Sequence, residues 1–198
     1  MERILLSDYL KSPRNLAIKI ILPIVVVLVS AQYGVATFAL IMIIIFTVCT
    51  GSGLKIVSLK SSKVFERLLI LPVSKKRLFL EHASIYTVLY SLQLAPAIII
   101  GMTYSSMTIL LYVLPSILLV TIIGTLVGIH AKGFGEIHLF SLFTMIPLVG
   151  LAMVRLPISY CFPFIFVTYP AFDLLGFFFS LVAILALVLV LLVDVSRL

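Results

Sequence analysis

Residues 20–54 read IILPIVVVLVSAQYGVATFALIMIIIFTVCTGSGL and contain no Asp, Glu, Lys or Arg. A helix needs about 20 apolar residues to cross the hydrocarbon core of a membrane, so this stretch is long enough for two crossings. Tyr33 and Gly34 lie near its middle, where a tight turn can divide it. The stretch therefore predicts two transmembrane helices, at residues 16–33 and 35–54.

The composition of the whole chain points to the same class of protein. Of 198 residues, 63% are hydrophobic and 11% are charged, and the mean hydropathy is +1.34. Soluble domains contain about 45–50% apolar and about 25% charged residues. We therefore expect an integral membrane protein. Its first residues lack the apolar core and small-residue cleavage site of a secretory signal, so we expect them to be retained.

Four more helices are expected beyond Glu81. No charged residue lies between Glu81 and Lys132, and the polar sequence TYSS at 103–106 divides this stretch in two. Two further apolar stretches follow it. The four expected spans are 83–102, 107–129, 137–154 and 174–193. The chain is thus predicted to be a single all-α domain, residues 1–198, with six transmembrane helices.

Positive charge is concentrated on one side of the predicted bundle. Six spans place both termini on the same side as the loop at 55–82, which carries seven Lys or Arg residues. Thirteen of the fourteen basic residues then share one face, and Arg155 lies on the other. The positive-inside rule makes the crowded face cytoplasmic. Topology thus explains the net charge of +7, and we expect no nucleic-acid partner, because no stacking platform accompanies the basic residues.

Residues 1–15 predict an amphipathic helix that lies along the inner leaflet. Apolar and charged residues alternate with helical spacing, and Pro13 marks the end of the helix. The apolar face consists of Leu5, Leu6, Tyr9 and Leu10. This helix either anchors the chain to the membrane or also contacts a partner subunit.

The segment at 155–173, between the fifth and sixth spans, is interrupted but apolar. With the two residues that follow, it contains three prolines and six aromatic residues, which favours short interfacial helices or a re-entrant hairpin at the outer face. An aromatic belt accounts for most of the rings, and Asp173 suits either a helix N-terminus or a gate. The candidate residues of an outer gate are Tyr160, Phe162, Phe164 and Asp173.

The sequence contains no recognisable catalytic or metal-binding motif. TGSGLKIVS, at residues 50–58, lacks the spacing of a phosphate-binding loop, and no H-E-x-x-H or G-x-S-x-G motif occurs. His82, His130 and His138 lie at predicted helix ends without cysteine or carboxylate partners at metal-ligand spacing. We expect no catalytic residue, cofactor or metal in this chain, and the three histidines are interpreted as interfacial polar residues.

Polar side chains inside the spans form two stripes. Tyr86, Tyr90 and Gln93 recur at i, i+4 and i+7 in the third span, and Ser141 and Thr144 lie in the fifth. Polar groups inside a membrane need a partner or a water-lined surface. The two stripes therefore either form hydrogen bonds between helices or line a substrate path.

Gly124 and Gly128 form a G-x-x-x-G pair in the fourth span. This spacing places two small residues on one face of a helix and permits close approach of a second helix. The second helix can belong to the same chain or to another chain.

Residues 63–71 predict a cytoplasmic amphipathic helix that ends at Pro72. Val64, Phe65, Leu68 and Leu69 form its apolar face, opposite Lys63, Glu66 and Arg67. Such a helix can lie on the membrane or insert its apolar face into a groove on a partner.

The sequence FERLLILPVS at 65–74 carries an acid followed by two leucines, a proline and a small polar residue. In this pattern, and at this place between the second and third of six spans, the chain resembles the permease subunits of ABC-2 type transporters. The resemblance extends to SPRN before LAIKIILP near the start and to the broken segment before the last span. IHAKGFGEIHLFSLFTMIPLVG, at 129–150, is similar to small drug-export permeases, including those labelled fluoroquinolone exporters.

The resemblance implies that residues 63–71 are a coupling helix that docks on a separate nucleotide-binding subunit. It also implies a second permease chain, ATP and Mg²⁺ bound by the partner ATPase, and an outer side closed by residues 156–172. The coupling residues would be Lys63, Val64, Phe65, Glu66, Arg67, Leu68, Leu69 and Pro72. Many family members carry further acids and a glycine upstream, where this chain has SLKSSKV. We therefore expect its contact with the ATPase to rely on basic residues and Glu66 alone.

The expected function is therefore ATP-driven export of a hydrophobic or amphipathic compound across the cytoplasmic membrane of a prokaryote. The alternatives are a stand-alone secondary transporter, a membrane scaffold or a lipid-modifying membrane enzyme. Spans two to six carry no charge at the membrane midplane, which disfavours a secondary transporter, and the lack of a catalytic constellation disfavours an enzyme. The substrate, and whether the second permease is identical, stay open.

Overall fold

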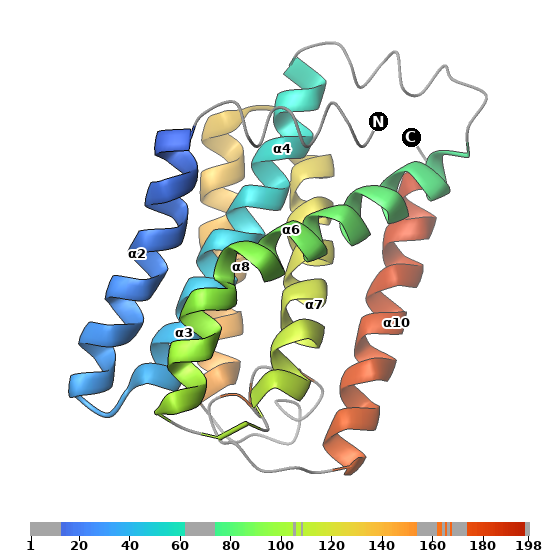
Figure 1. The fold of residues 1–198 in the computed structure, drawn as a ribbon. Coiled ribbons are helices and arrows are strands. Elements are labelled where there is room, and N and C mark those ends of the chain that lie inside the picture. Colours follow the sequence, from blue (N-terminus) through green and yellow to red (C-terminus); the bar gives the residue numbers. More distant parts are fainter. Residues whose placement is uncertain are drawn as a thin grey trace.

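A computed structural model describes residues 13–61, 74–104, 106–107, 109–153, 162–163, 165, 167 and 174–196. Throughout these ranges the regular structure is helical and contains no strand (Figure 1). The prediction of an all-α fold is confirmed for this part of the chain. The interfacial helix expected at residues 1–15 lies mostly outside the described residues.

The described residues form eight helical elements. In chain order they are α2 (Pro13–Gln32), α3 (Ala36–Ile44), η1 (Ile45–Cys49), α4 (Thr50–Ser61), α6 (Lys75–Thr103), α7 (Ile109–His130), α8 (Phe134–Met153) and α10 (Leu174–Ser196). The element η1 is a π-helical turn, and α3, η1 and α4 form one continuous helix, Ala36–Ser61.

Within the described ranges, five helices are long and apolar enough to cross a membrane. They are Ala36–Ser61, Lys75–Thr103, Ile109–His130, Phe134–Leu151 and Leu175–Ser196. The first predicted span corresponds to α2, whose apolar part, Ala17–Gln32, is shorter. The fold is thus that of a helical membrane protein with five candidate membrane-crossing helices, and the six-span topology stays a prediction.

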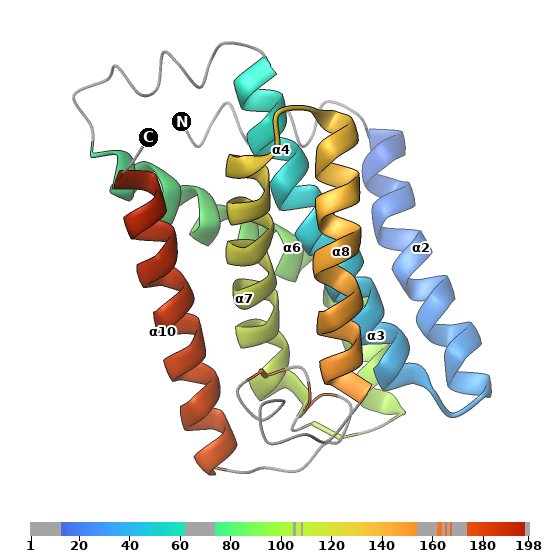
Figure 2. The same cartoon turned by 180° about the vertical axis from the view of Figure 1, so that it is seen from behind.

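The helices form one bundle with α7 near its centre. The two opposite views place α2 and α10 at its two edges, with α7 between them (Figures 1 and 2). Helix α7 packs against α4, α6 and α10, and Tyr112, Ile117 and Val120 are among its fully buried side chains. The bundle core is therefore built around α7.

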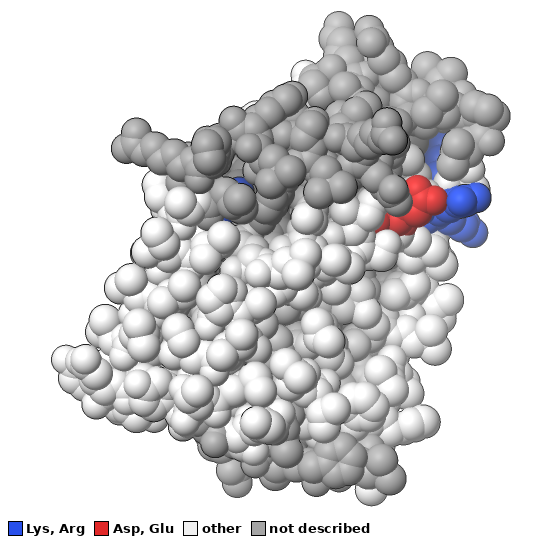
Figure 3. Space-filling view, in the orientation of Figure 1, with Lys and Arg blue, Asp and Glu red and all other residues white. Residues whose placement is uncertain are grey.

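Several helix ends meet at one end of the bundle. Helices α4, α7 and α10 finish there, and α2, α6 and α8 begin there (Figures 1 and 2). The charged side chains visible on one face gather near this end, while the wall further down consists of residues other than Lys, Arg, Asp and Glu (Figure 3). We call this the charged end.

Two helices extend well past the predicted spans, by more than a turn. Helix α4 continues past residue 54 to Ser61, and α6 begins at Lys75, before residue 83. Lysine is a good helix former whose long side chain reaches the headgroups, so charge marks the edge of the hydrocarbon and not the end of a helix. An ion pair of 2.8 Å between Arg77 and Glu81, one turn apart, supports the start of α6.

The predicted turns lie where the polar residues suggested. Helix α2 ends at Gln32, and Gly34 has a φ of +70°, a conformation that glycine adopts without steric cost. Helix α6 ends at Thr103, and α7 begins at Ile109. The turns expected at Tyr33 and Gly34 and at TYSS are confirmed.

The G-x-x-x-G pair packs against a helix of the same chain. A Cβ atom on Gly128 would lie 2.7 Å from the carbonyl oxygen of Gly53, and one on Gly53 would lie 2.9 Å from that of Gly124. On the other side of this crossing, Gly124 faces Ser52 and the carbonyl of Cys49. Glycines on both helices thus bring the backbones of α4 and α7 into direct contact.

Candidate functional site

Several predicted site residues lie outside the described residues. These are the coupling residues Lys63, Val64, Phe65, Glu66, Arg67, Leu68, Leu69 and Pro72, and the gate residues Tyr160, Phe164 and Asp173. The described neighbours of the coupling segment are Ser61, at the end of α4, and Ser74, just before α6. Phe162, the remaining gate candidate, is partly buried and packs against the core.

The polar stripe of α6 faces the interior of the bundle. Tyr86 is 2% exposed, and Tyr90 and Gln93 are each 4% exposed. His82 continues the stripe by one turn: its ring centroid lies 4.4 Å from that of Tyr86, which lies 6.0 Å from that of Tyr90. The three rings and the amide thus form a buried ladder along one face of α6.

His82 is buried, and its interpretation as an interfacial residue was wrong. It is 2% exposed, and its Nε2 atom has no hydrogen-bond partner within the described structure. Its position four residues before Tyr86 places it on the same face of the helix, so the i, i+4 spacing could have identified it. His82 had been interpreted as interfacial because it lies at the predicted cytoplasmic end of the third span.

Gln93 compensates for a proline in a neighbouring helix. Pro23 of α2 has no N–H, so it cannot donate to the carbonyl of Lys19 one turn earlier. The Nε2 atom of Gln93 donates to this carbonyl oxygen at 3.3 Å. A backbone carbonyl left without a donor in hydrocarbon is costly, so this bond stabilises the contact between α2 and α6.

Two lysines complete a polar cluster where α2, α4 and α6 meet. The hydroxyl of Tyr90 lies against Gly51 of α4, where a Cβ atom would collide with it. The charge of Lys55, one turn further along α4, acts on both Lys19 and His82. We call Lys19, Lys55, His82, Tyr86, Tyr90 and Gln93 the inner polar cluster.

The carboxylates described in the structure have partners elsewhere. Glu81 pairs with Arg77, and Glu136 accepts a hydrogen bond of 2.8 Å from the backbone N–H of Lys132. Asp194 pairs with His130. The described partners of these three carboxylates thus lie outside the inner polar cluster.

The stripe of α8 lies at a different interface. Ser141 is 1% exposed and lies next to Cys49, on the side of α8 that packs against η1 and α4. Thr144 is partly exposed, and its hydroxyl donates to the carbonyl of Phe140 in its own helix at 2.7 Å. The two predicted stripes are therefore separate features of the fold.

A groove opens beside the inner polar cluster, between α2 and the helix formed by α3 and η1. Its volume is about 300 Å³. Its lining residues are Ile18, Lys19, Leu22, Pro23, Val26, Met42, Ile43, Phe46 and Thr47. All of them except Lys19 and Thr47 are apolar, and Phe46 and Thr47 belong to the π-helical turn. We call this the α2–α3 groove.

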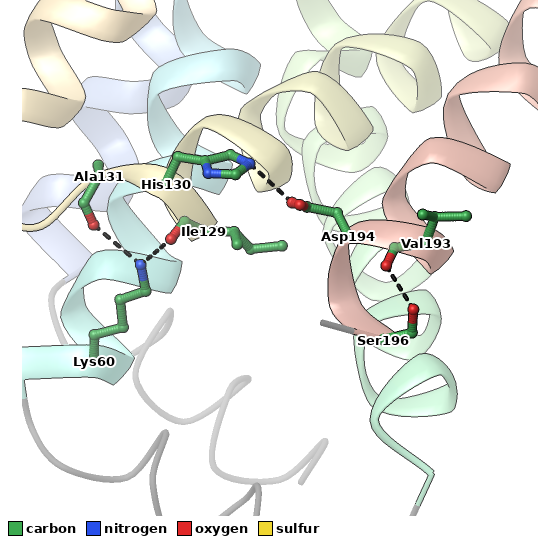
Figure 4. A network of polar contacts seen from close by, with 7 residues as sticks. All are labelled: Lys60, Ile129, His130, Ala131, Val193, Asp194 and Ser196. Carbon is green, nitrogen blue, oxygen red and sulfur yellow. Dashed lines mark hydrogen bonds and ion pairs between the residues drawn. The ribbon is translucent and has the colours of Figure 1, made fainter. Parts of the chain in front are cut away.

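A second polar network joins three helices at the charged end (Figure 4). The Nζ atom of Lys60 donates to the carbonyl oxygens of Ile129 and Ala131, at 3.0 Å from the latter. The next contact joins His130 Nε2 to Asp194 Oδ2 at 2.9 Å. Lys60 thus interacts with the negative end of the α7 dipole, and His130 links α7 to α10. We call this the end network.

Sequence reasoning missed the end network. His130 was interpreted as an interfacial residue, and Asp194 was given no role. A basic residue at the end of one helix and a lone acid at the end of another are a weak signal, because nothing local indicates that the two ends meet.

The described residues contain no group of three or more His, Cys, Asp or Glu side chains that could hold a metal ion. Comparisons with known protein families, with curated proteins and with solved structures give no match. The class of protein that the structure defines is a helical membrane protein with a partly buried polar cluster and a polar network at its charged end.

Proposed function

We propose that this chain is the transmembrane subunit of an ATP-binding cassette exporter. It spans the cytoplasmic membrane of a prokaryote six times, with α2 as its first span and both termini in the cytoplasm. A separate nucleotide-binding subunit binds Mg²⁺ and ATP, and a second permease chain completes the transporter. The cargo is a hydrophobic or amphipathic compound, because the spans offer mostly apolar surface.

The end network is the observation that supports this proposal. The segment at 62–73, which contains the proposed coupling helix, follows α4 and precedes α6 in the chain. The end of α4 and the start of α6 both lie at the charged end (Figures 1 and 2). Lys60, next to the last residue of α4, is bonded to the end of α7, and α7 is linked to α10. A force on this segment would therefore reach two other helices through short polar contacts.

The inner polar cluster is the proposed cytoplasmic part of the substrate path. Burying polar side chains inside a membrane protein is costly, and they often mark a functional route. Opening the path would separate α2 from α6 and break the bond between Gln93 and Lys19. Gln93→Leu should change the response of ATPase activity to substrate while the complex still assembles; an unchanged response to every cargo would exclude this path.

Other predicted residues have proposed roles that follow from the same assignment. Ser141 and Thr144 would contact cargo from α8 when the helices rearrange. Tyr160, Phe162, Phe164 and Asp173 would close the outer side of the path.

The test of the function is a double substitution in the coupling helix, Phe65→Ala with Glu66→Lys. It removes one apolar anchor, worth about 1.5–3 kcal/mol when buried, and inverts one charge at the expected interface. We expect the variant to insert and dimerise normally but to bind the nucleotide-binding subunit weakly and to lose ATP-dependent transport. Phe65→Leu with Glu66→Asp is the matched control and should retain both activities.

Copurification and transport assays in proteoliposomes measure the two effects. If the first variant binds the ATPase and transports normally, residues 63–71 are only a membrane-surface helix and not a coupling helix. Transport by the chain alone, driven by an ion gradient, would instead identify a secondary transporter.

A further inference from the structure

A second groove lies where α6, α7 and α10 meet. Its volume is about 520 Å³. Helix α6 begins beside the end of α10, at the charged end, and crosses α7 from there (Figures 1 and 2). All three helices are long and apolar enough to cross a membrane. Lipid is therefore the solvent that surrounds this place, which we call the α6–α7–α10 groove.

Most of the length of this groove is apolar. Its walls include Leu118 and Ile122 of α7 and Val188 of α10. Leu118 and Ile122 come 12 and 8 residues before His130, which places them about 18 and 12 Å from the end of α7. The hydrocarbon core of a bilayer is about 30 Å thick, so each leaflet contributes about 15 Å. The groove thus covers the depth of the acyl chains of one leaflet.

One end of the groove carries a pair of opposite charges. Arg77 and Glu81 lie one turn apart near the start of α6, with 2.8 Å between Nε and Oε1. Their side chains are 75% and 43% exposed. The next charged residue in the sequence is Lys132, so Glu81 marks the edge of the hydrocarbon. The pair therefore lies at the level of the lipid headgroups.

We propose that the α6–α7–α10 groove binds phosphatidylethanolamine, with its phosphate at Arg77, its ammonium group at Glu81 and an acyl chain along the apolar walls. The headgroup and the ion pair each carry one positive and one negative charge, so the two are complementary. The contact between the side chains uses Nε and Oε1, and the headgroup would meet the Nη groups and Oε2. Both new contacts are charge-assisted hydrogen bonds.

The ammonium group makes this site selective among lipids. The choline group of phosphatidylcholine has no N–H, and its methyl groups keep its charge further from a carboxylate than a hydrogen bond of about 2.7–2.9 Å does. Phosphatidylglycerol offers no cation to Glu81. The acyl chain adds little selectivity, because hydrocarbon gains little on moving from lipid to an apolar groove.

A protein segment is a poorer occupant of this groove. It would have to present an acid to Arg77 and a base to Glu81 at the depth where the hydrocarbon begins, and charged residues are costly in that region. Each phosphatidylethanolamine molecule has both charges at this depth. The lipid site requires only the membrane location of the protein, and it is independent of the proposed transport function.

The experiment uses the absence of tryptophan from the sequence. Val188→Trp places a single indole in the groove, and Phe143→Trp places one on the exposed face of α8 as a control. Each full-length variant is reconstituted in phosphatidylcholine vesicles in which one brominated lipid replaces a fixed fraction of the total. Quenching of tryptophan fluorescence then reports which lipid lies beside the indole.

At position 188 we expect brominated phosphatidylethanolamine to compete about threefold better than brominated phosphatidylcholine, as one partly exposed charge pair implies. Glu81→Gln should abolish this preference. The N,N-dimethyl lipid, which keeps one N–H, should compete at an intermediate level. Leu80→Trp reports on the same groove if Val188→Trp does not fold.

Two control positions should show no preference between these two lipids. Phe143→Trp faces the surrounding lipid, and Phe46→Trp lies in the α2–α3 groove, whose described lining residues include no carboxylate. A preference at these positions as well would reflect the bulk bilayer and would contradict a specific site.

Four results at position 188 would overturn the proposal. Equal quenching by the ethanolamine and choline lipids would exclude recognition of the ammonium group, and a preference that survives Glu81→Gln would place its origin elsewhere. A stronger preference for brominated phosphatidylglycerol would mean that basic residues at the start of α6 attract anionic lipid instead. Quenching by no lipid, with normal quenching at position 143, would mean that protein covers the groove.

Discussion

At the scale of single residues, Gly128 leaves no room for a side chain. A Cβ atom there would lie 2.7 Å from the carbonyl oxygen of Gly53 and 2.9 Å from its Cα, and a backbone cannot move aside as a flexible side chain can. We expect Gly128→Ala to lower the free energy of unfolding by about 1–3 kcal/mol, as overpacking does. Unfolding in mixed micelles measures this loss.

Gly150 provides the matched control, because it lies in helix α8 with open space around its Cβ position. Gly150→Ala should leave stability unchanged or raise it by about 0.5–1 kcal/mol, since alanine favours a helix. A similar effect of both substitutions would contradict the close contact of α4 and α7.

The bond between Gln93 and Lys19 gives a prediction that depends on Pro23. Gln93→Leu should cost about 1 kcal/mol of unfolding free energy, the usual net value of a hydrogen bond. In a Pro23→Ala background the new N–H can donate to the Lys19 carbonyl, so the same substitution should cost less. A double-mutant cycle measures this coupling.

Pro115 of α7 serves as the control background, because its helix position has no relation to Lys19. Gln93→Leu should cost the same in Pro115→Ala as in the original chain. An equal cost in the Pro23→Ala background too would show that Gln93 does not compensate for the missing N–H.

At the scale of elements, Lys60 is expected to hold α4 against the end of α7. Lys60→Met keeps most of the length of the side chain but removes the donor to the carbonyls of Ile129 and Ala131. We expect a loss of about 1–2 kcal/mol in unfolding free energy, because the bond is charge-assisted and favoured by the helix dipole. The measurement is again unfolding in mixed micelles.

Lys76→Met, on the exposed start of α6, should change stability little. If the proposed function holds, Lys60→Met should also reduce transport more than ATPase binding. If Lys60→Met is as stable as Lys76→Met, the bonds of Lys60 do not hold α4 against α7.

Most elements could be predicted from sequence because membrane helices follow from local composition. The uncharged stretch at 20–54, its turn at Gly34 and the stripe of α6 all depend on neighbouring residues. The continuation of α4 to Ser61 could not be predicted in the same way, because the charges of Lys55 and Lys60 suggested that a cytoplasmic loop had already begun. The links from Lys60 to α7 and from His130 to Asp194 join residues far apart in the chain, which no local pattern reveals.

At the scale of the whole molecule, the predicted six-span topology differs from a five-span one by the position of the N-terminus. If α2 crosses the membrane, Ser7→Cys and Ser196→Cys should both react with an impermeant thiol reagent only after the cells are opened. If α2 does not cross, the two positions should react from opposite sides. Both variants require a background without Cys49 and Cys161.

Ser74→Cys, beside the coupling segment, should react like Ser196→Cys, whereas Ser105→Cys and Ser159→Cys should react in intact cells. This pattern follows from thirteen basic residues on one face against one on the other. If Ser74→Cys reacts in intact cells and Ser105→Cys does not, the protein has the opposite orientation to the predicted one.

The missing N–H of Pro23 has a consequence for biogenesis. During translation α2 leaves the ribosome well before α6, and Gln93 follows Lys19 by 74 residues. Until α6 arrives, the translocon must handle a short apolar helix with a lysine and a carbonyl that lacks its helical donor, which is a weak insertion signal. A chain truncated before α6 should therefore integrate α2 poorly, and integration should improve once the nascent chain includes Gln93.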